Sequence, residues 1–249
     1  MVNGRALAIF GALAMLRCSS FGAGSGSGGT PEPDAGPRPD AARVDEDAAV
    51  PPAVDSGACA LAFCERFDVP DWQKRWSTSD KATLTVVSDH VSPPASLELF
   101  LSGNRSTQRI ARALPTGKAV YTLRTKFKVI ARGNGEIDFA ELRFAIPTGD
   151  LGFHLSYAAG VNSYVIESSD KRLPVTATFV SWTSLVIEVN VDRGEFRYAI
   201  DGVYSKPELA GSGLGTATGV TALFGAPFAS GATVDWRVRF DDIELGPAE

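Results

Sequence analysis

The strongest constraint on the fold is a period-two alternation of apolar and polar residues that recurs through residues 58–249. In VYTLRTKFKVI, from Val120 to Ile130, tyrosine, leucine, phenylalanine and valine alternate with arginine and lysine. This alternation gives a strand one buried and one solvated face, as in antiparallel sheets. The pattern returns at 151–157, 185–191, 196–200 and 234–240. No segment longer than a turn or two shows helical periodicity.

Turn-forming sequences separate the alternating segments. They are GNG at 133–135, PTGD at 147–150, DRG at 192–194 and DG at 201–202. The roughly 190 residues of this region are enough for one sizeable core. Many short antiparallel strands with one wet face each predict an all-β fold, a two-sheet antiparallel β-sandwich or jelly roll.

The first 18 residues have the features of an export leader. Arg5 supplies a positive start, and the following ALAIFGALAML is an apolar run too short to span a bilayer. Cys18 lies where a bacterial lipoprotein would be cleaved and acylated, although Arg17 occupies a position where a small residue is expected. Cleavage after the A-x-A of Ala12 to Ala14 is the alternative.

Residues 19–57 contain almost no large apolar side chains but abundant glycine, serine, proline, alanine and aspartate. A segment of this composition cannot bury enough surface to fold, so we predict a disordered linker. Such a linker would hold the domain of 58–249 away from a membrane that carries the lipid on Cys18. The predicted location is the outer membrane or cell surface, or, without the lipid, the periplasm or the medium.

The three cysteines fit an oxidising compartment. If Cys18 takes the lipid, Cys59 and Cys64 remain as an even pair, and we predict a disulfide between them that locks the start of the folded domain. A zinc site is not predicted, because a second cysteine pair is missing and the two histidines, His90 and His154, stand alone in the sequence.

The charge of the domain gives no sign of a nucleic-acid partner. The whole chain carries a net charge of −5, and seven of its acidic residues fall in the linker. The domain itself is therefore near neutral, with no basic stripe and no polybasic membrane patch. Contact with a membrane is expected only through the lipid anchor.

Three stretches of the domain resemble the concanavalin A-like lectin and glucanase jelly rolls, which include laminin-G-like modules. They are FCERFD with Trp72 and Trp76 soon after it, the hairpin WTSLVIEVNVDRGEFRYAIDGV, and the closing strand VDWRVRFDDIEL. The resemblance implies that the final strand pairs beside the first. It covers nearly all of 63–246, and it points to fold more than to function, because this architecture hosts lectins, adhesion modules and glycosidases alike.

The stretch GNGEIDFAELRF carries Glu136, Asp138 and Glu141 in the order E-x-D-x-x-E. In the laminarinase-type hydrolases of this superfamily, the resemblance would make Glu136 the nucleophile, Glu141 the general acid/base, and Asp138 the group that tunes them. The apolar phase slips between Phe139 and Leu142, which predicts a β-bulge near Ala140 that brings all three acids to one face.

The position of this strand argues against catalysis. In those enzymes another strand, rich in aromatic residues, precedes the acidic strand, whereas here only a tight RGNG connection at 132–135 does. In the non-catalytic interpretation, Glu136 and Asp138 flank a hairpin turn, and Glu141 pairs with a base such as Arg143 or Arg124 on a solvated face. We therefore favour no catalytic residue, and keep a β-glucan hydrolase using the three acids as the alternative.

Other candidate site residues are few. His154, beside Ser156, is predicted to be a surface histidine. A second phase slip, between Phe240 and Ile243, leaves two interpretations, a bulge with solvated carboxylates or a structural calcium site; the four acids that would bind calcium are Asp241, Asp242, Glu65 and Asp68. No other cofactor is expected. Three aromatic residues in or near loops could stack on sugar rings or simply cap the sandwich: Tyr164, Tyr204 and Phe228.

Together these features predict an exported, lipid-anchored surface protein with one non-catalytic laminin-G-like jelly roll. Glycan is the expected partner, with a surface or extracellular protein as the alternative. A hydrolase and a purely structural module are the competing functions.

Overall fold

The computed structural model describes residues 59–78, 84–102, 107–230 and 235–247. The predicted leader (1–18) and linker (19–57), with the proposed lipid site at Cys18, lie outside these residues. Among the described residues, no helix is long and apolar enough to cross a membrane. Their helical segments are two single 3₁₀ turns, η1 (Trp72–Arg75) and η2 (Leu214–Thr216).

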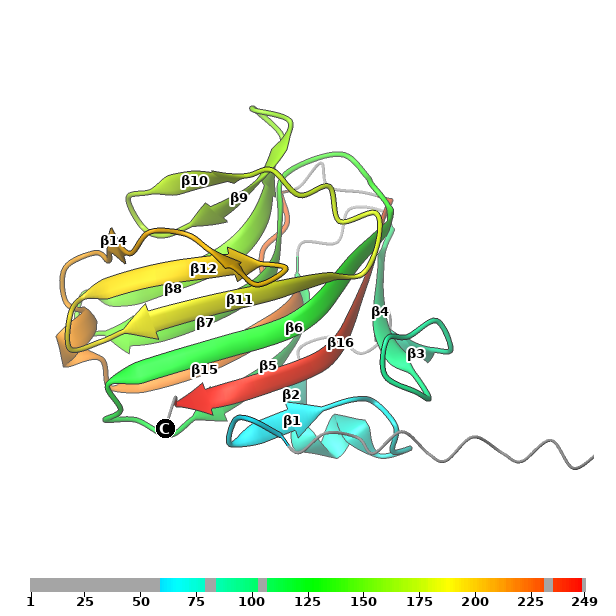
Figure 1. Cartoon of the computed structure of the whole chain (residues 1–249), viewed down its shortest axis with the longest axis horizontal. Helices are drawn as coiled ribbons and strands as arrows, with labels where there is room; N and C mark the ends of the chain where they lie inside the picture. Colours follow the sequence, from blue (N-terminus) through cyan, green and yellow to red (C-terminus); the bar gives the residue numbers. More distant parts are fainter. Residues whose placement is uncertain (1–58, 79–83, 103–106, 231–234, 248–249) are drawn as a thin grey trace, which may run out of the picture. The chain divides into compact units, whose positions relative to one another are not determined.

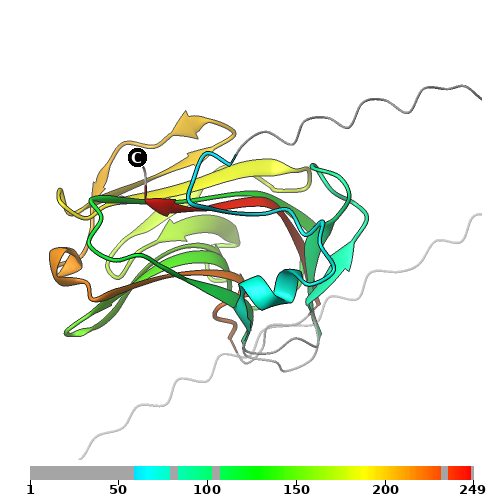
Figure 2. The same cartoon turned by 90° about the horizontal axis from the view of Figure 1, so that it is seen from below.

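The described chain forms two antiparallel sheets packed face to face (Figures 1 and 2), so the predicted all-β sandwich is confirmed. The nine-stranded sheet has the order β13 (Val203–Tyr204), β12 (Glu195–Ile200), β11 (Thr183–Asn190), β6 (Val120–Ala131), β16 (Trp236–Pro247), β4 (Ser96–Leu101) and β3 (Leu84–Val87), with β1 (Phe63–Glu65) beside β16 and β14 (Glu208–Leu209) beside β12. The seven-stranded sheet has the order β10 (Arg172–Val175), β9 (Ser163–Glu167), β8 (Gly149–Ala158), β7 (Ile137–Ile146), β15 (Gly219–Ala226), β5 (Gln108–Leu114) and β2 (Ser77–Thr78).

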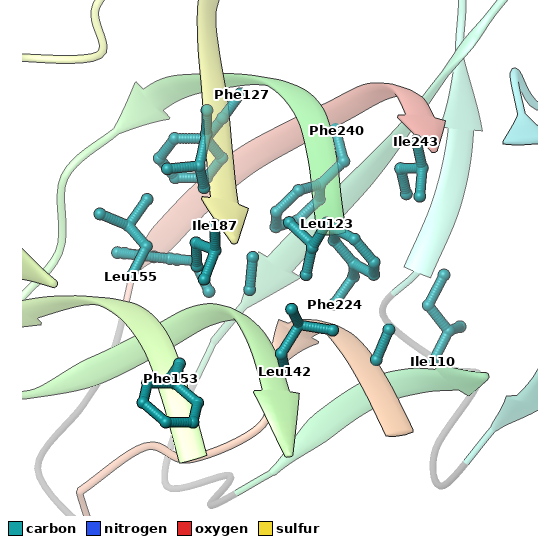
Figure 3. Close-up of a cluster of buried hydrophobic side chains, with 14 of the residues drawn as sticks. Ile110, Leu123, Phe127, Leu142, Phe153, Leu155, Ile187, Phe224, Phe240 and Ile243 are labelled. Carbon is teal, nitrogen blue, oxygen red and sulfur yellow. The ribbon is translucent and has the colours of Figure 1, made fainter. Parts of the chain in front are cut away.

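The core lies between the sheets and is built from the apolar halves of the alternating strands. Phe127 of β6 contacts Phe139 of β7 and Phe240 of β16, with ring centroids 5.1 and 5.3 Å apart. Phe224 of β15 reaches Phe240 from the opposite sheet at 5.8 Å. Figure 3 shows Phe127, Phe224 and Phe240 among the buried side chains between the strands. The period-two pattern therefore translates directly into one shared core.

The first and last strands of the described residues lie in the same sheet. β1 pairs antiparallel with β16, as the resemblance implied, with Phe63 opposite Leu245 and Glu65 opposite Ile243. Cys59, just ahead of β1, and Cys64, within β1, form the predicted disulfide.

The predicted slip in β16 is also present. Its register against β6 shifts between Asp241 and Glu244, and Asp242 adopts a φ of +46°. Phe240 and Ile243 can consequently both face the core.

The predicted hairpin at RGNG is wrong. β6 pairs with β11 and β16, whereas β7 pairs with β8 and β15 in the other sheet. The short connection between them therefore carries the chain across the sandwich, because each strand buries its own apolar face against the same core. This crossover places the acidic strand β7 near the middle of the seven-stranded sheet.

Candidate functional site

A bulge in β7 determines where the acids point. Asp138 pairs with Ser156 of β8, and Ala140 pairs with Leu155, so Phe139 is an extra residue. Phe139 and Leu142 can consequently both be buried in the core. Asp138 and Glu141 then share the face that turns away from the core, which we call the outer face. The bulge predicted near Ala140 is confirmed.

Glu141 is held by Arg143, two residues along the same strand. Arg143 donates Nε–H to Oε1 at 2.8 Å and Nη2–H to Oε2 at 2.7 Å. This bidentate hydrogen bond, stronger than the effect of burial, raises the pKa of Arg143. The predicted partner of Glu141 is confirmed, but the predicted solvated face is wrong at this point, because Glu141 is only 4% exposed.

Asp138 is the second buried acid of the outer face. The hydroxyl of Ser156 donates a hydrogen bond to its Oδ1 at 2.7 Å. Burial raises the pKa of Asp138, and the charge of His154 and the hydrogen bond from Ser156 offset this only in part. Asp138 is thus a carboxyl group that is costly to ionise without a cation beside it.

His154 is the basic side chain beside Asp138. It lies on the outer face, but it is only partly exposed and lies near two acids. Its Nε2 lies 3.3 Å from Oε2 of Glu167 on β9 and 3.8 Å from Oδ2 of Asp138 on β7. Burial lowers the pKa of His154. The hydrogen bond with Glu167 and the charges of Asp138 and Glu141 together raise this pKa by more than burial lowers it, so it lies above its ordinary value. The same hydrogen bond lowers the pKa of Glu167.

We expect the pair of His154 and Glu167 to stabilise the fold most under mildly acidic conditions. The raised pKa of His154 contributes stability below its ordinary value of 6.5, and this contribution is lost as the pH rises through the folded-state pKa. The lowered pKa of Glu167 contributes above 4.5 and is lost on acidification through the folded-state pKa. His154→Gln should therefore lower the melting temperature more at about pH 5.5 than at about pH 8.5. Equal losses at both pH values would contradict a charged His154.

Three residues of the outer face could hold a divalent cation. Each of these residues offers one ligand atom, and the three atoms lie within 4.8 Å of one another; the residues are Asp138, His154 and Glu167. Imidazole and carboxylate ligands together suit first-row transition metals. Ser156 and Arg172 bind the other carboxylate oxygens of Asp138 and Glu167, which would orient both groups.

The two glutamates of the hydrolase alternative both lie against arginines. Arg172 of β10 contacts Oε1 of Glu136 at 3.4 Å and also binds Glu167. Since Arg143 engages both oxygens of Glu141, that carboxylate would have to leave a bidentate ion pair before it could donate a proton. The bulge brings the acids to one face, but Glu136 lies against Arg172 and Glu141 lies against Arg143.

The residues predicted for calcium lie around the β1–β16 pair. Asp241 is buried and accepts three backbone N–H groups, and Glu65 is buried and accepts a backbone N–H and an indole N–H. Asp242 lies 3.8 Å from Arg66, and Asp68 is exposed. Calcium at these residues stays a prediction.

The three candidate aromatic residues are not brought together. Phe228 is 48% exposed; its carbonyl accepts the N–H of Asp138 and the next residue, Ala229, pairs with Ile137, so Phe228 lies opposite Asp138 in register. Tyr204 is 45% exposed on β13 of the other sheet, under the guanidinium of Arg197. Tyr164 is only 7% exposed and packs in the core.

Comparisons with known proteins identify the fold. No protein-family model and no curated protein matches the chain. Among solved structures, a pseudo β-1,3-glucanase and immunostimulatory antigen of Mycobacterium tuberculosis is similar, with a TM-score of 0.56 and 13% identity over 76% of this chain and 100% of that one. A sialidase matches with a TM-score of 0.50 and 8% identity, over 70% of this chain but only 17% of its own. The chain therefore shares the two-sheet β-sandwich fold of these structures.

Proposed function

We propose that the jelly roll binds glycan without cleaving it, and that the outer face of the seven-stranded sheet is the binding surface. The observation that carries the proposal is the exposed Phe228, which lies opposite Asp138 in register, with Asp138 part of a fixed cluster of charged side chains. An aromatic ring offers a flat apolar surface to the C–H face of a sugar, and carboxylates, imidazole and guanidinium groups hydrogen-bond to its hydroxyls. The fold shared with a pseudo β-1,3-glucanase supports this class of ligand.

The cations on both glutamates favour binding over hydrolysis. A retaining hydrolase needs one free carboxylate as the nucleophile and one protonated carboxyl as the acid, roughly 5 to 5.5 Å apart. Here Arg172 neutralises Glu136 and Arg143 neutralises Glu141. The bulge, which brings the acids to one face, is the observation that keeps the hydrolase as a second candidate.

We also propose that the protein is exported, with residues 19–57 as a linker and Cys18 as the lipid site. The disulfide between Cys59 and Cys64 supports export, because such bonds persist in oxidising compartments. Labelling with a fatty-acid analogue tests the anchor, and a Cys18→Ser chain that still takes up the label would contradict it.

Binding to a panel of β-glucans tests the glycan proposal. Phe228→Ala should weaken binding about tenfold, because a stacked ring contributes about 1.5 kcal/mol and each 1.4 kcal/mol is a factor of ten. Tyr204→Ala, which removes a similarly exposed ring from the other sheet, should leave binding unchanged. Isothermal calorimetry and product analysis are run on each variant.

Three outcomes would contradict the proposal. Loss of binding in Tyr204→Ala but not in Phe228→Ala would place the site on the other sheet. Sugar products that disappear in Glu136→Gln would support the hydrolase. No binding to any glycan would favour a protein-binding or structural module.

A further inference from the structure

A separate cavity of about 480 Å³ lies at one end of the sandwich. It is lined by the last residues of β6, the connection between β8 and β9, and the segment after β10. Its size is in the range of small-molecule sites, and its lining includes none of the acids of the outer face. Among the described residues that line it there is no carboxylate, although there is a guanidinium group.

Tyr164 is the buried polar group of this cavity. Its ring packs against Phe179 and Tyr157, with centroids 4.9 and 5.4 Å away, so the side chain has a fixed position. Within the described part of the chain, no hydrogen bond to its hydroxyl is found, and the hydroxyl is not among the fully buried polar atoms, so it keeps access to solvent at the cavity. Burial raises the pKa of Tyr164 to about 12, so the hydroxyl remains a donor at physiological pH.

Arg132 supplies the positive charge of the cavity. Its guanidinium lies 4.6 Å from the ring centroid of Tyr157, and it donates a hydrogen bond to Oδ1 of Asn162, which also accepts from the Tyr157 hydroxyl. These contacts fix the guanidinium plane but use few of its five N–H donors. Arg132 and Tyr164 both line the cavity, and both contact the ring of Tyr157.

We propose that this cavity binds a uronic acid, with its carboxylate between Arg132 and the hydroxyl of Tyr164. A planar guanidinium and a phenol are both donors, and a carboxylate accepts from both. Val175 and Val180 form an apolar wall for the sugar ring, and the hydroxyls of Thr176 and Thr178 can pair with those of the ring. The hydroxyls of Thr176 and Thr178 favour a sugar acid over a fatty acid, because a fatty-acid chain has no hydroxyl groups to pair with them.

The choice of a sugar acid rests on the proposed glycan function, but the site is separate from the outer face. An NMR titration with glucuronate as the probe, and glucose as its uncharged counterpart, tests it directly. Glucuronate should shift the signals of Arg132 and Tyr164 and bind at least tenfold more tightly than glucose, because a hydrogen bond to a charged group contributes about 1.5–3 kcal/mol.

Two variants test the two donors. Arg132→Gln should weaken glucuronate binding about tenfold, and Tyr164→Phe, which keeps the ring in place, should weaken it severalfold. Arg193→Gln is the matched control, since it removes the same charge from the turn between β11 and β12. Phe228→Ala should leave glucuronate binding intact while weakening β-glucan binding, so failure of one site is distinguishable from failure of the other.

Equal affinity for glucose and glucuronate, or no detectable glucuronate binding, would overturn the proposal. Unchanged binding in both Arg132→Gln and Tyr164→Phe would overturn it as well. If Arg132→Gln lowers the melting temperature, the result with Tyr164→Phe decides.

Discussion

Replacing Phe127 with alanine is expected to lower the free energy of unfolding by about 3–5 kcal/mol, the largest effect predicted for any substitution considered for this chain. The side chain is fully buried and contacts Phe139 across the sandwich, Phe240 on the neighbouring strand, and Phe179. Truncation would remove the transfer free energy of the ring and leave a cavity that three fixed rings cannot fill. Urea unfolding followed by tryptophan fluorescence measures the change.

The control for Phe127→Ala is Val86→Ala on β3, where the valine is 40% exposed. A surface truncation of this kind should change the free energy of unfolding by at most about 0.5 kcal/mol. A loss below about 1 kcal/mol for Phe127→Ala would mean that the two sheets do not share one tightly packed core.

Arg143→Met is expected to lower the free energy of unfolding by about 3 kcal/mol, because it removes the bidentate partner of the buried carboxylate of Glu141. Adding Glu141→Leu should restore most of the loss, since a buried ion pair replaced by apolar side chains is often neutral or stabilising. Thermal and urea unfolding of the single and double variants measure both steps.

Arg197→Met is the matched control for Arg143→Met. Arg197 pairs with Glu188 at 2.7 Å, but this pair is more exposed, and exposed pairs contribute at most about 1 kcal/mol. Equal losses in Arg143→Met and Arg197→Met would contradict the buried pair. They would also remove the argument that Glu141 is locked away from acid catalysis.

Most of the fold could be predicted because its determinants are local. Alternation from Val120 to Ile130 marks β6, and the slipped phase between Phe139 and Leu142 is sufficient to place the bulge in β7. The pairing of Glu141 with Arg143 could also be predicted, since residues two apart on a strand share a face.

The parts that could not be predicted depend on pairing between distant strands. The cluster at His154 exists because β8 lies between β7 and β9 in a register that places His154 opposite both Glu141 and Glu167. A histidine and two distant acids give no sequence spacing from which this register follows. The crossover at 132–135 could not be predicted for a related reason, because a short glycine-rich connection suits a hairpin and a sheet-to-sheet crossing equally well.

The pairing of β1 with β16 also decides how the domain would carry a load. Any segment attached ahead of Cys59 pulls on the nine-stranded sheet, through the disulfide and the three residue pairs between β1 and β16. The outer face of the seven-stranded sheet is on the opposite side of the sandwich. A domain held by its N-terminus can therefore be strained at one sheet while the other presents Phe228 and the charged cluster to the surroundings.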